Sequence, residues 1–150
     1  MKILLLILAL AIPSAAQIEQ LMKQGANVTL KDEALVFVPV KFEPCTLIWQ
    51  IKRNNVITRE TTMNLGDLDP DRIRVEPVRD EPGIIQVMLY TISSRELITE
   101  QTVYKDDSRG ELSNKSVQVI LVKKRSTADK LAQAFASGAR TCIEKTSRDH

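Results

Sequence analysis

The 150-residue chain is poor in the side chains that carry most enzyme chemistry. Its one histidine, His150, is the last residue, and the ends of a chain are where order is lowest. An ordered Ser-His-Asp set, a Cys-His pair and a zinc site of clustered cysteine and histidine are therefore excluded. We expect no catalytic residue, no metal site and no cofactor, and hence no enzyme.

Aromatic residues are also scarce, at 4% of the chain, and no charge of one sign dominates. Without Lys2, which belongs to the N-terminal segment, 20 basic residues face 19 acidic ones. Binding of nucleic acid usually needs a basic surface with aromatic side chains for base stacking. We therefore expect no nucleic-acid partner.

An acidic turn offers the nearest approach to a metal loop. Asp67, Asp69 and Asp71 stand at alternate positions in Gly66–Asp71, as ligands do in a calcium loop. The central glycine and the terminal glutamate of an EF-hand are missing from this stretch. We interpret it as a solvated turn.

Only one long apolar run is present, and it lies at the N-terminus. Lys2 precedes the apolar residues 3–12, and Pro13-Ser14-Ala15-Ala16 follows with small side chains. The run is too short to span a bilayer, and this order of segments is typical of a signal peptide. We predict a signal peptide over 1–16, a secreted, extracellular product starting at Gln17, and no membrane span.

Cysteine is rare, with Cys45 and Cys142 alone in the chain. In an oxidising compartment the two could pair, and closing so long a loop would stabilise the fold by about 4–5 kcal/mol. A free thiol and an intermolecular bridge are the alternatives, and the sequence leaves all three open.

What the chain does contain is a succession of β-type segments. In Leu47–Lys52 the residues Leu47, Trp49 and Ile51 share one face, which is the alternation of a strand that borders a core. Segments 84–92 and 96–104, joined by a serine turn, are predicted to form a hairpin. The full set of predicted strands is 28–31, 34–40, 47–52, 56–62, 72–76, 84–92, 96–104 and 116–122.

A helical period begins only near the C-terminus. Ser126 and Asp129 have the spacing of a capping box, and Gly138 is predicted to stop the helix. Between them Ala128, Leu131, Ala134 and Phe135 mark one apolar face of a short helix.

Four segments in order resemble the layout of a V-set immunoglobulin domain, most closely that of SLAM-type leukocyte receptors. They are Gly25–Leu30 (GANVTL), Leu47–Lys52 with Trp49, Asp71–Val75, and Pro82–Tyr90. The resemblance implies an all-β fold, an immunoglobulin-like antiparallel β-sandwich over 17–122 with a short C-terminal helix. Residues 123–150 would be a basic linker and short helical tail.

One departure from the family follows from the residues. The positions of the inter-sheet disulfide, in 35–40 and 87–89, are apolar, so the bridge is lacking. The core would then depend on burial of Phe37, Trp49, Ile73, Ile85, Val87 and Leu89.

The resemblance also implies a function in protein–protein recognition. In SLAM-type receptors the sheet with strands C, C′, F and G meets the partner, which here would be a protein, another immunoglobulin-like domain or a second copy of the chain. The outward residues nominated for binding are Gln50, Lys52, Arg59, Gln86, Arg95, Glu100 and Thr102. Asn27 and Asn114 lie in N-x-Ser/Thr sequons and are predicted glycosylation sites.

Two other functions stay open. Lys123-Lys124-Arg125 could be a dibasic processing site, which would make the chain a secreted precursor of a helical peptide. A β-barrel that carries a small ligand would also contain many apolar strands.

Overall fold

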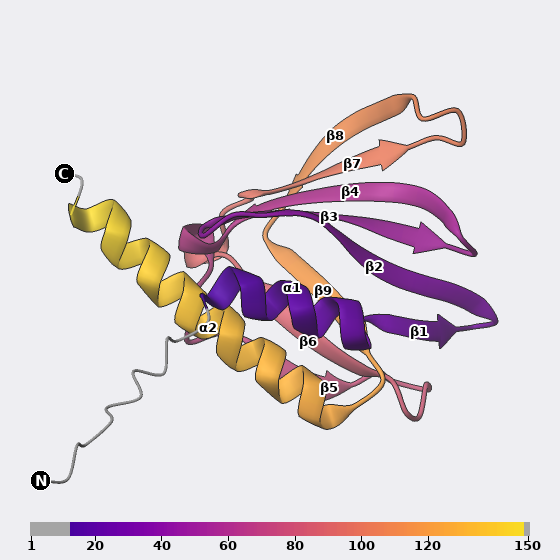
Figure 1. The fold of residues 1–150 in the computed structure, drawn as a ribbon, viewed down its shortest axis with the longest axis horizontal. Coiled ribbons are helices and arrows are strands. Elements are labelled where there is room, and N and C mark those ends of the chain that lie inside the picture. The colour runs from indigo at the N-terminus through magenta and orange to yellow at the C-terminus, as the bar shows by residue number, and fades with distance from the viewer. Residues whose placement is uncertain (1–12, 149–150) are drawn as a thin grey trace, which may run out of the picture.

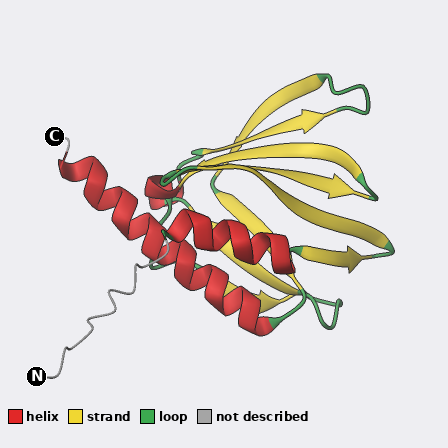
Figure 2. Cartoon of the chain, in the orientation of Figure 1, coloured by secondary structure: helices red, strands yellow, loops and turns green. Residues whose placement is uncertain are grey.

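The structure is a computed structural model that describes residues 13–148. It is a mixed α/β fold of two antiparallel sheets with two helices packed on them (Figures 1 and 2). The helices are α1 (Ser14–Gly25) and α2 (Arg125–Arg148), and η1 (Leu65–Asp67) and η2 (Ile92–Ser94) are short 3-10 turns. The all-β immunoglobulin-like sandwich expected from the sequence is therefore wrong, because helices supply one whole layer of this fold.

A six-stranded sheet holds most of the chain, in the order β1-β2-β3-β4-β7-β8. Its strands are β1 (Asn27–Leu30), β2 (Glu33–Phe42), β3 (Thr46–Arg53), β4 (Val56–Asn64), β7 (Ile98–Val103) and β8 (Arg109–Lys115). A three-stranded sheet follows the order β5-β6-β9, with β5 (Arg74–Pro77), β6 (Ile85–Tyr90) and β9 (Val117–Val122). Ser116 alone separates β8 from β9, so one extended segment serves both sheets.

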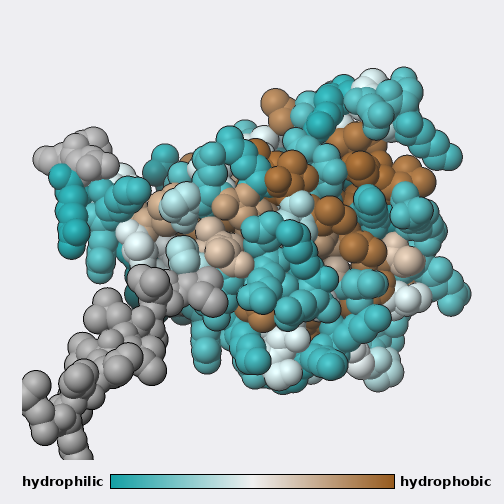
Figure 3. All heavy atoms as spheres, in the orientation of Figure 1, coloured by the Kyte–Doolittle hydropathy of each residue, from teal (hydrophilic) through white to brown (hydrophobic). Residues whose placement is uncertain are grey.

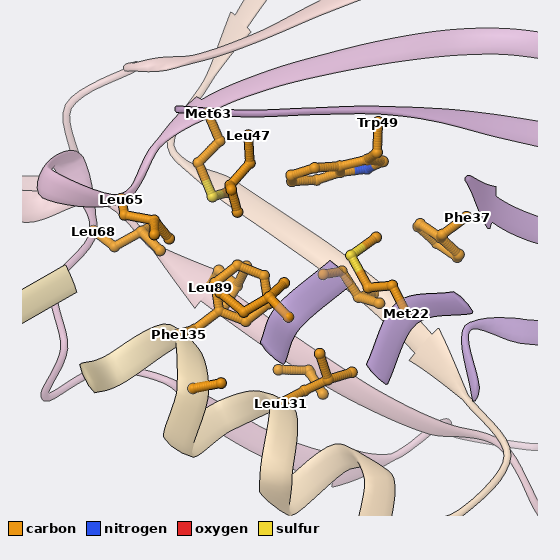
Figure 4. Packing of buried hydrophobic residues seen from close by; sticks show 14 of the residues in the cluster. Met22, Phe37, Leu47, Trp49, Met63, Leu65, Leu68, Leu89, Leu131 and Phe135 are labelled. Carbon is orange, nitrogen blue, oxygen red and sulfur yellow. The ribbon is translucent and has the colours of Figure 1, made fainter. Parts of the chain in front are cut away.

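The two faces of the six-stranded sheet differ in what covers them. Residues directly opposite each other on neighbouring antiparallel strands share a face. Trp49 pairs with Thr61, and Thr61 pairs with Glu100, on the face that we call the inner face. Gln50 pairs with Glu60 on the other side, the outer face. Figure 1 shows α1 and α2 on one side of this sheet. Buried side chains of the inner face, such as Trp49, point toward the helices (Figure 4).

The two helices run antiparallel, and a glycine on each brings them close. A Cβ on Gly25 would lie 2.6 Å from Thr127 Cγ2, and one on Gly138 would lie 3.1 Å from Ser14 Cβ. The first residue of α1 therefore meets Gly138 and its last residue meets Thr127. The stop predicted at Gly138 is wrong, because this glycine is an internal helix position that makes room for α1.

One core joins the sheets and the helices. Trp49, Leu47 and Met63 project from the inner face toward Phe135 and Met22 on the helices (Figure 4). Trp49 is fully buried, which confirms the core position predicted from its strand. Of the other predicted core residues, Phe37, Val87 and Leu89 are buried, whereas Ile73 and Ile85 are half-buried and pack against the core.

A disulfide ties the helical layer to the sheet. Cys45, between β2 and β3, is bonded to Cys142 in α2, and the two Cα atoms lie 5.8 Å apart. The bridge closes a loop with a sequence separation of 97 residues. This confirms the paired state among the three that the sequence left open.

The predicted hairpin over 84–104 is wrong, although both of its strands exist. β6 pairs with β5 and β9, whereas β7 pairs with β4 and β8 in the other sheet. Between them Ser93 and Ser94 have positive φ, and the Thr91 hydroxyl donates to the Arg95 carbonyl oxygen at 2.5 Å. These serines form a corner that sends the chain from one sheet to the other.

The helical content of the chain is much higher than the sequence predicts. α2 is 24 residues long and was predicted to be short. α1 was not predicted; it begins at Ser14, and Ala15, Ile18 and Met22 form its buried stripe. Residues 1–12 of the predicted signal peptide lie outside the described residues, whereas its residues 14–16 form the start of α1, with Ala15 buried.

Candidate functional site

The seven residues nominated for binding do not share one face. The structure places Gln50 and Lys52 on the outer face of β3. It places Arg59, Glu100 and Thr102 on the inner face, because Arg59 pairs with Thr102 and Glu100 pairs with the inward-facing Thr61. The immunoglobulin pattern assumed one sheet for all of them, and the true topology separates them.

The remaining two lie outside this sheet. Gln86 is on β6, in the three-stranded sheet, and Arg95 follows η2 in the corner between the sheets. A single docking face therefore cannot use all seven side chains, and the candidate site has to be rebuilt from the observed faces.

On the inner face, Glu100 is occupied by contacts within the molecule. Its carboxylate accepts from Lys115 Nζ at 2.5 Å and from Arg59 NH1 at 3.4 Å. Its side chain is only 14% exposed. These charges stabilise the pairing of β4, β7 and β8, and they leave Glu100 little capacity to bind a partner.

The outer face carries a second polar network, centred on Glu60. The amide of Gln50 donates to Glu60 Oε2 at 2.9 Å, and Arg109 NH1 lies 3.0 Å from Glu60 Oε1. Burial alone would raise the pKa of Glu60, but the hydrogen bonds from Gln50 and Arg109 and the Arg109 charge outweigh it and hold the pKa below its usual value. The network joins β3, β4 and β8 across this face.

Half-buried aliphatic side chains lie beside this network on β2, β3 and β4. Val36 shares the outer face with Lys52, Val38 with Gln50, and Ile57 with Lys52. These three half-buried side chains give the outer face apolar surface beside its fixed polar groups. Figure 3, which shows one side of the molecule, likewise has apolar residues exposed among hydrophilic ones over the strand region.

The edge of this sheet is open at β8. β8 pairs with β7 on one side only, and it is the last strand in the sheet order. Five of its seven residues are exposed, and Leu112, on the outer face, is 65% exposed. Backbone groups on the free side of such a strand have no partner within the sheet and can pair with another strand.

The other end of the sheet is less open. β1 has four residues, and Lys23 and Met22 of α1 lie beside Val38 and Pro39 of β2. Pro39 has no backbone N–H, so it further limits pairing on that edge. β8 is therefore the longest unprotected edge that the described part of the chain offers.

Both glycosylation sequons are accessible. Asn27, the first residue of β1, is exposed, and so is Asn114 on β8. The Thr99 hydroxyl donates to Asn114 Oδ1 at 3.4 Å, which is a weak contact. A glycan at either asparagine stays a prediction, and one at Asn114 would stand on the free edge.

The acidic turn forms no ligand cage. The Asp71 backbone N–H donates to Asp69 Oδ1 at 3.0 Å, and the Asp71 carboxylate pairs with Arg140 at 3.4 Å. Burial raises the pKa of Asp67, and the nearby Arg95 charge opposes this rise. Among residues 13–148 no group of three or more histidine, cysteine, aspartate or glutamate side chains is placed to hold a metal ion. His150 lies outside that range, and the expectation of a non-enzyme stays a prediction.

The core geometry bears on the two alternative functions. Arg125 begins α2, so cleavage after it would cut at a helix that contributes seven buried residues, and the Cys45–Cys142 bond would hold the fragment in place. The space between the sheets and the helices is filled by side chains such as Trp49 and Phe135 (Figure 4). Neither a released peptide nor an internal ligand is favoured by this arrangement.

Comparisons with known proteins add no relative. No family model matches the chain, and neither the curated proteins nor the solved structures yield a match. None of the described helices combines the length and the apolar character needed to cross a bilayer.

Sequence reasoning missed β8, the strand at the centre of this site. Its residues, Arg109–Lys115, contain a glycine and only one large apolar side chain, Leu112, so no alternation of apolar and polar residues marks it. The sequence does carry one signal for β8, because this segment stands between two predicted strands. The turn at Lys105–Ser108 can connect it to β7 as the second strand of a hairpin.

Proposed function

We propose that the protein is a secreted recognition module without catalytic activity, which binds an extended segment of another protein along the free edge of β8. A strand added there continues the six-stranded sheet and gains main-chain hydrogen bonds, while its alternate side chains contact the outer face. The observation that carries the proposal is the open, proline-free edge of β8 with Leu112 exposed beside it.

The outer face supplies the side-chain part of this recognition. Gln101 lies opposite Leu112, and its amide donates to the Gly110 carbonyl at 3.2 Å, so the surface next to the edge is held in place. Gln50, Glu60 and Arg109 are fixed by their mutual contacts. A preformed surface of this kind lowers the entropy lost on binding, which favours affinity.

Secretion is supported by two independent features. The N-terminal sequence has the order of a signal peptide, and a structural disulfide such as Cys45–Cys142 is typical of proteins in oxidising compartments. An extended partner segment would then be met outside the cell.

Linear peptides displayed on phage are the probe for this function. We expect peptides selected on the folded protein to slow amide hydrogen exchange in residues 109–115 and to lose binding to L112K. The control is V56K, which adds the same charge at Val56, an exposed aliphatic residue of the β3–β4 hairpin that lies away from the β8 edge. Peptides that protect another segment, or that bind L112K as well as V56K, would overturn the proposal.

A second copy of the chain is the simplest alternative partner. Sedimentation equilibrium over a range of concentrations measures self-association directly. Pairing of β8 with the β8 of a second copy would give a dimer, which L112K should abolish and V56K should retain. The proposal requires Asn114 to stay largely unglycosylated, against the prediction from its sequon, because a glycan there would block the edge. Mass analysis of the protein from secreting eukaryotic cells decides between the two, and full occupancy of Asn114 would contradict the proposal.

A further inference from the structure

A small pocket at the end of β6 gathers positive charge around an aromatic ring. Asp71, Arg72, Ile73, Arg74 and Tyr90 line this cavity of about 310 Å³. The guanidinium carbon of Arg72 lies 4.9 Å from the centre of the Tyr90 ring, and that of Arg74 lies 6.0 Å from it. Two cations thus share one ring.

The strand register explains why these groups meet. Arg74 on β5 pairs with Met88 on β6, and Tyr90 follows two residues later, so Arg74 and Tyr90 stand on the same face of the three-stranded sheet. The core side chains Val87 and Leu89 point to the opposite face and are buried. The Tyr90 hydroxyl makes only a weak contact, with Met88 Sδ at 3.9 Å, so the ring itself is the part of Tyr90 that faces the two guanidinium groups.

The charges in the pocket are only partly compensated. Arg74 NH1 lies 3.9 Å from Glu76, a long ion pair, and Arg72 NH1 reaches only the Ser94 hydroxyl, at 3.4 Å. Asp71 is paired with Arg140 at 3.4 Å. Within the described residues Arg72 has no carboxylate partner, so the cluster carries an excess of positive charge.

We infer that this pocket binds a phosphate or sulfate ester group of a small molecule. Two guanidinium forks that line one cavity can each donate a pair of hydrogen bonds, and a tetrahedral oxyanion offers oxygen atoms in more than one plane to accept them. A carboxylate satisfies a single fork and leaves the other unpaired. The Tyr90 ring holds both cations in position before the ligand arrives, which reduces the ordering required on binding.

This site is independent of the proposed function. The pocket lies on the three-stranded sheet, whereas the β8 edge belongs to the six-stranded sheet. Loss of peptide binding in L112K would therefore say nothing about the pocket, and loss of anion binding would say nothing about the edge.

Titration with methyl phosphate and methyl sulfate at constant ionic strength tests the inference, with backbone amide and arginine side-chain NMR signals as the readout. We expect saturable shifts at Arg72, Arg74 and Tyr90, and sodium acetate should bind about tenfold more weakly or worse because it engages one fork. The stronger of the two esters identifies the source of the oxyanion. Shifts that rise linearly without saturation, or that map elsewhere, would show general charge screening and overturn the inference.

Matched variants separate a built site from loose surface charge. R72Q and R74Q are each expected to weaken binding about tenfold, as the loss of a charged hydrogen-bond partner does. R79Q removes the same charge from an exposed position in the β5–β6 turn, at the opposite end of the hairpin from Tyr90, and should bind as the wild type does. Y90L should weaken binding while Y90F should not, since only Y90L loses the ring. Equal loss in R79Q and R72Q, or unchanged binding in Y90L, would contradict the proposed arrangement.

Discussion

The side of the molecule that α1 and α2 cover and the β7–β8 side of its larger sheet are built on different interactions. In the covered region large apolar side chains such as Trp49 and Phe135 are fully buried, and the Cys45–Cys142 bond fastens helix to sheet. At the β7–β8 side the contacts are ion pairs and side-chain amide bonds around Glu60 and Glu100, with Leu112 left exposed. Burial contributes far more to stability than partly exposed ion pairs do. Damage in the first region should therefore be measured as unfolding, and damage in the second as lost binding.

The largest effect is expected from breaking the disulfide. C45S/C142S removes a bridge that closes a loop of 97 residues, and loop entropy predicts a loss of about 4–5 kcal/mol in the free energy of unfolding. Urea unfolding followed by the fluorescence of Trp49 measures it. A loss below about 1 kcal/mol would show that packing of α2 alone holds the two layers together.

The second-largest loss of stability is expected from truncating a core side chain on α2. F135A removes a fully buried ring and should cost about 3–5 kcal/mol, whereas F135L keeps most of the volume and should cost clearly less. The same urea experiment applies. Equal, small losses for the two variants would mean that α2 contributes little to the core, and the contrast between the two regions would fail.

A smaller, pH-dependent effect is expected at Glu60. Because the folded pKa of Glu60 lies below its usual value of 4.5, its charged form stabilises the fold above that value, and this contribution is lost as the pH falls through the folded pKa. E60Q should therefore lower stability by about 0.2–1 kcal/mol at pH 7 and by nothing at a pH below the folded pKa.

The double variant E60Q/R109Q shows how much of that effect belongs to the ion pair. If Arg109 is the main partner, the double variant should be about as stable as E60Q alone. Fully additive losses, or a loss for E60Q that does not change with pH, would contradict the role given to this network.

The smallest effect on stability is expected at the exposed edge. L112K replaces a side chain that is 65% exposed, and surface changes of this kind stay within about 0.5 kcal/mol. Its effect on peptide binding should nevertheless be large. A destabilisation of several kcal/mol would show that Leu112 belongs to the folded core rather than to a recognition surface.

The strands could be predicted from the sequence far better than their arrangement. Alternation around Trp49 identified β3 and its buried face, because period-two burial leaves its mark in a single segment. The pairing of β6 with β9 leaves no local mark, and the serine corner at Ser93 was therefore interpreted as a hairpin turn. Strand partners depend on contacts between distant segments.

The predictions of the helices and of the binding site were wrong for other reasons. α1 overlaps the end of the predicted signal peptide, so the sequence assigns its Ser14 and Ala15 to the cleaved segment and gives no sign of a helix there. Gly138 was interpreted as a helix stop because the close approach of Ser14 cannot be seen in the sequence. The face of each candidate residue follows from strand register, which explains why Gln50 and Glu100, both nominated together, lie on opposite sides of the sheet.

The continuity of β8 and β9 through Ser116 has a mechanical consequence. β9 contributes the buried Ile120 and Val122 to the core, and β8 is the strand to which a partner would attach. A force applied to a bound segment would put the β7–β8 hydrogen bonds under shear. The backbone would transmit the same force through Ser116 to β9. Under such a force, binding of the partner and packing of the core would therefore be lost together.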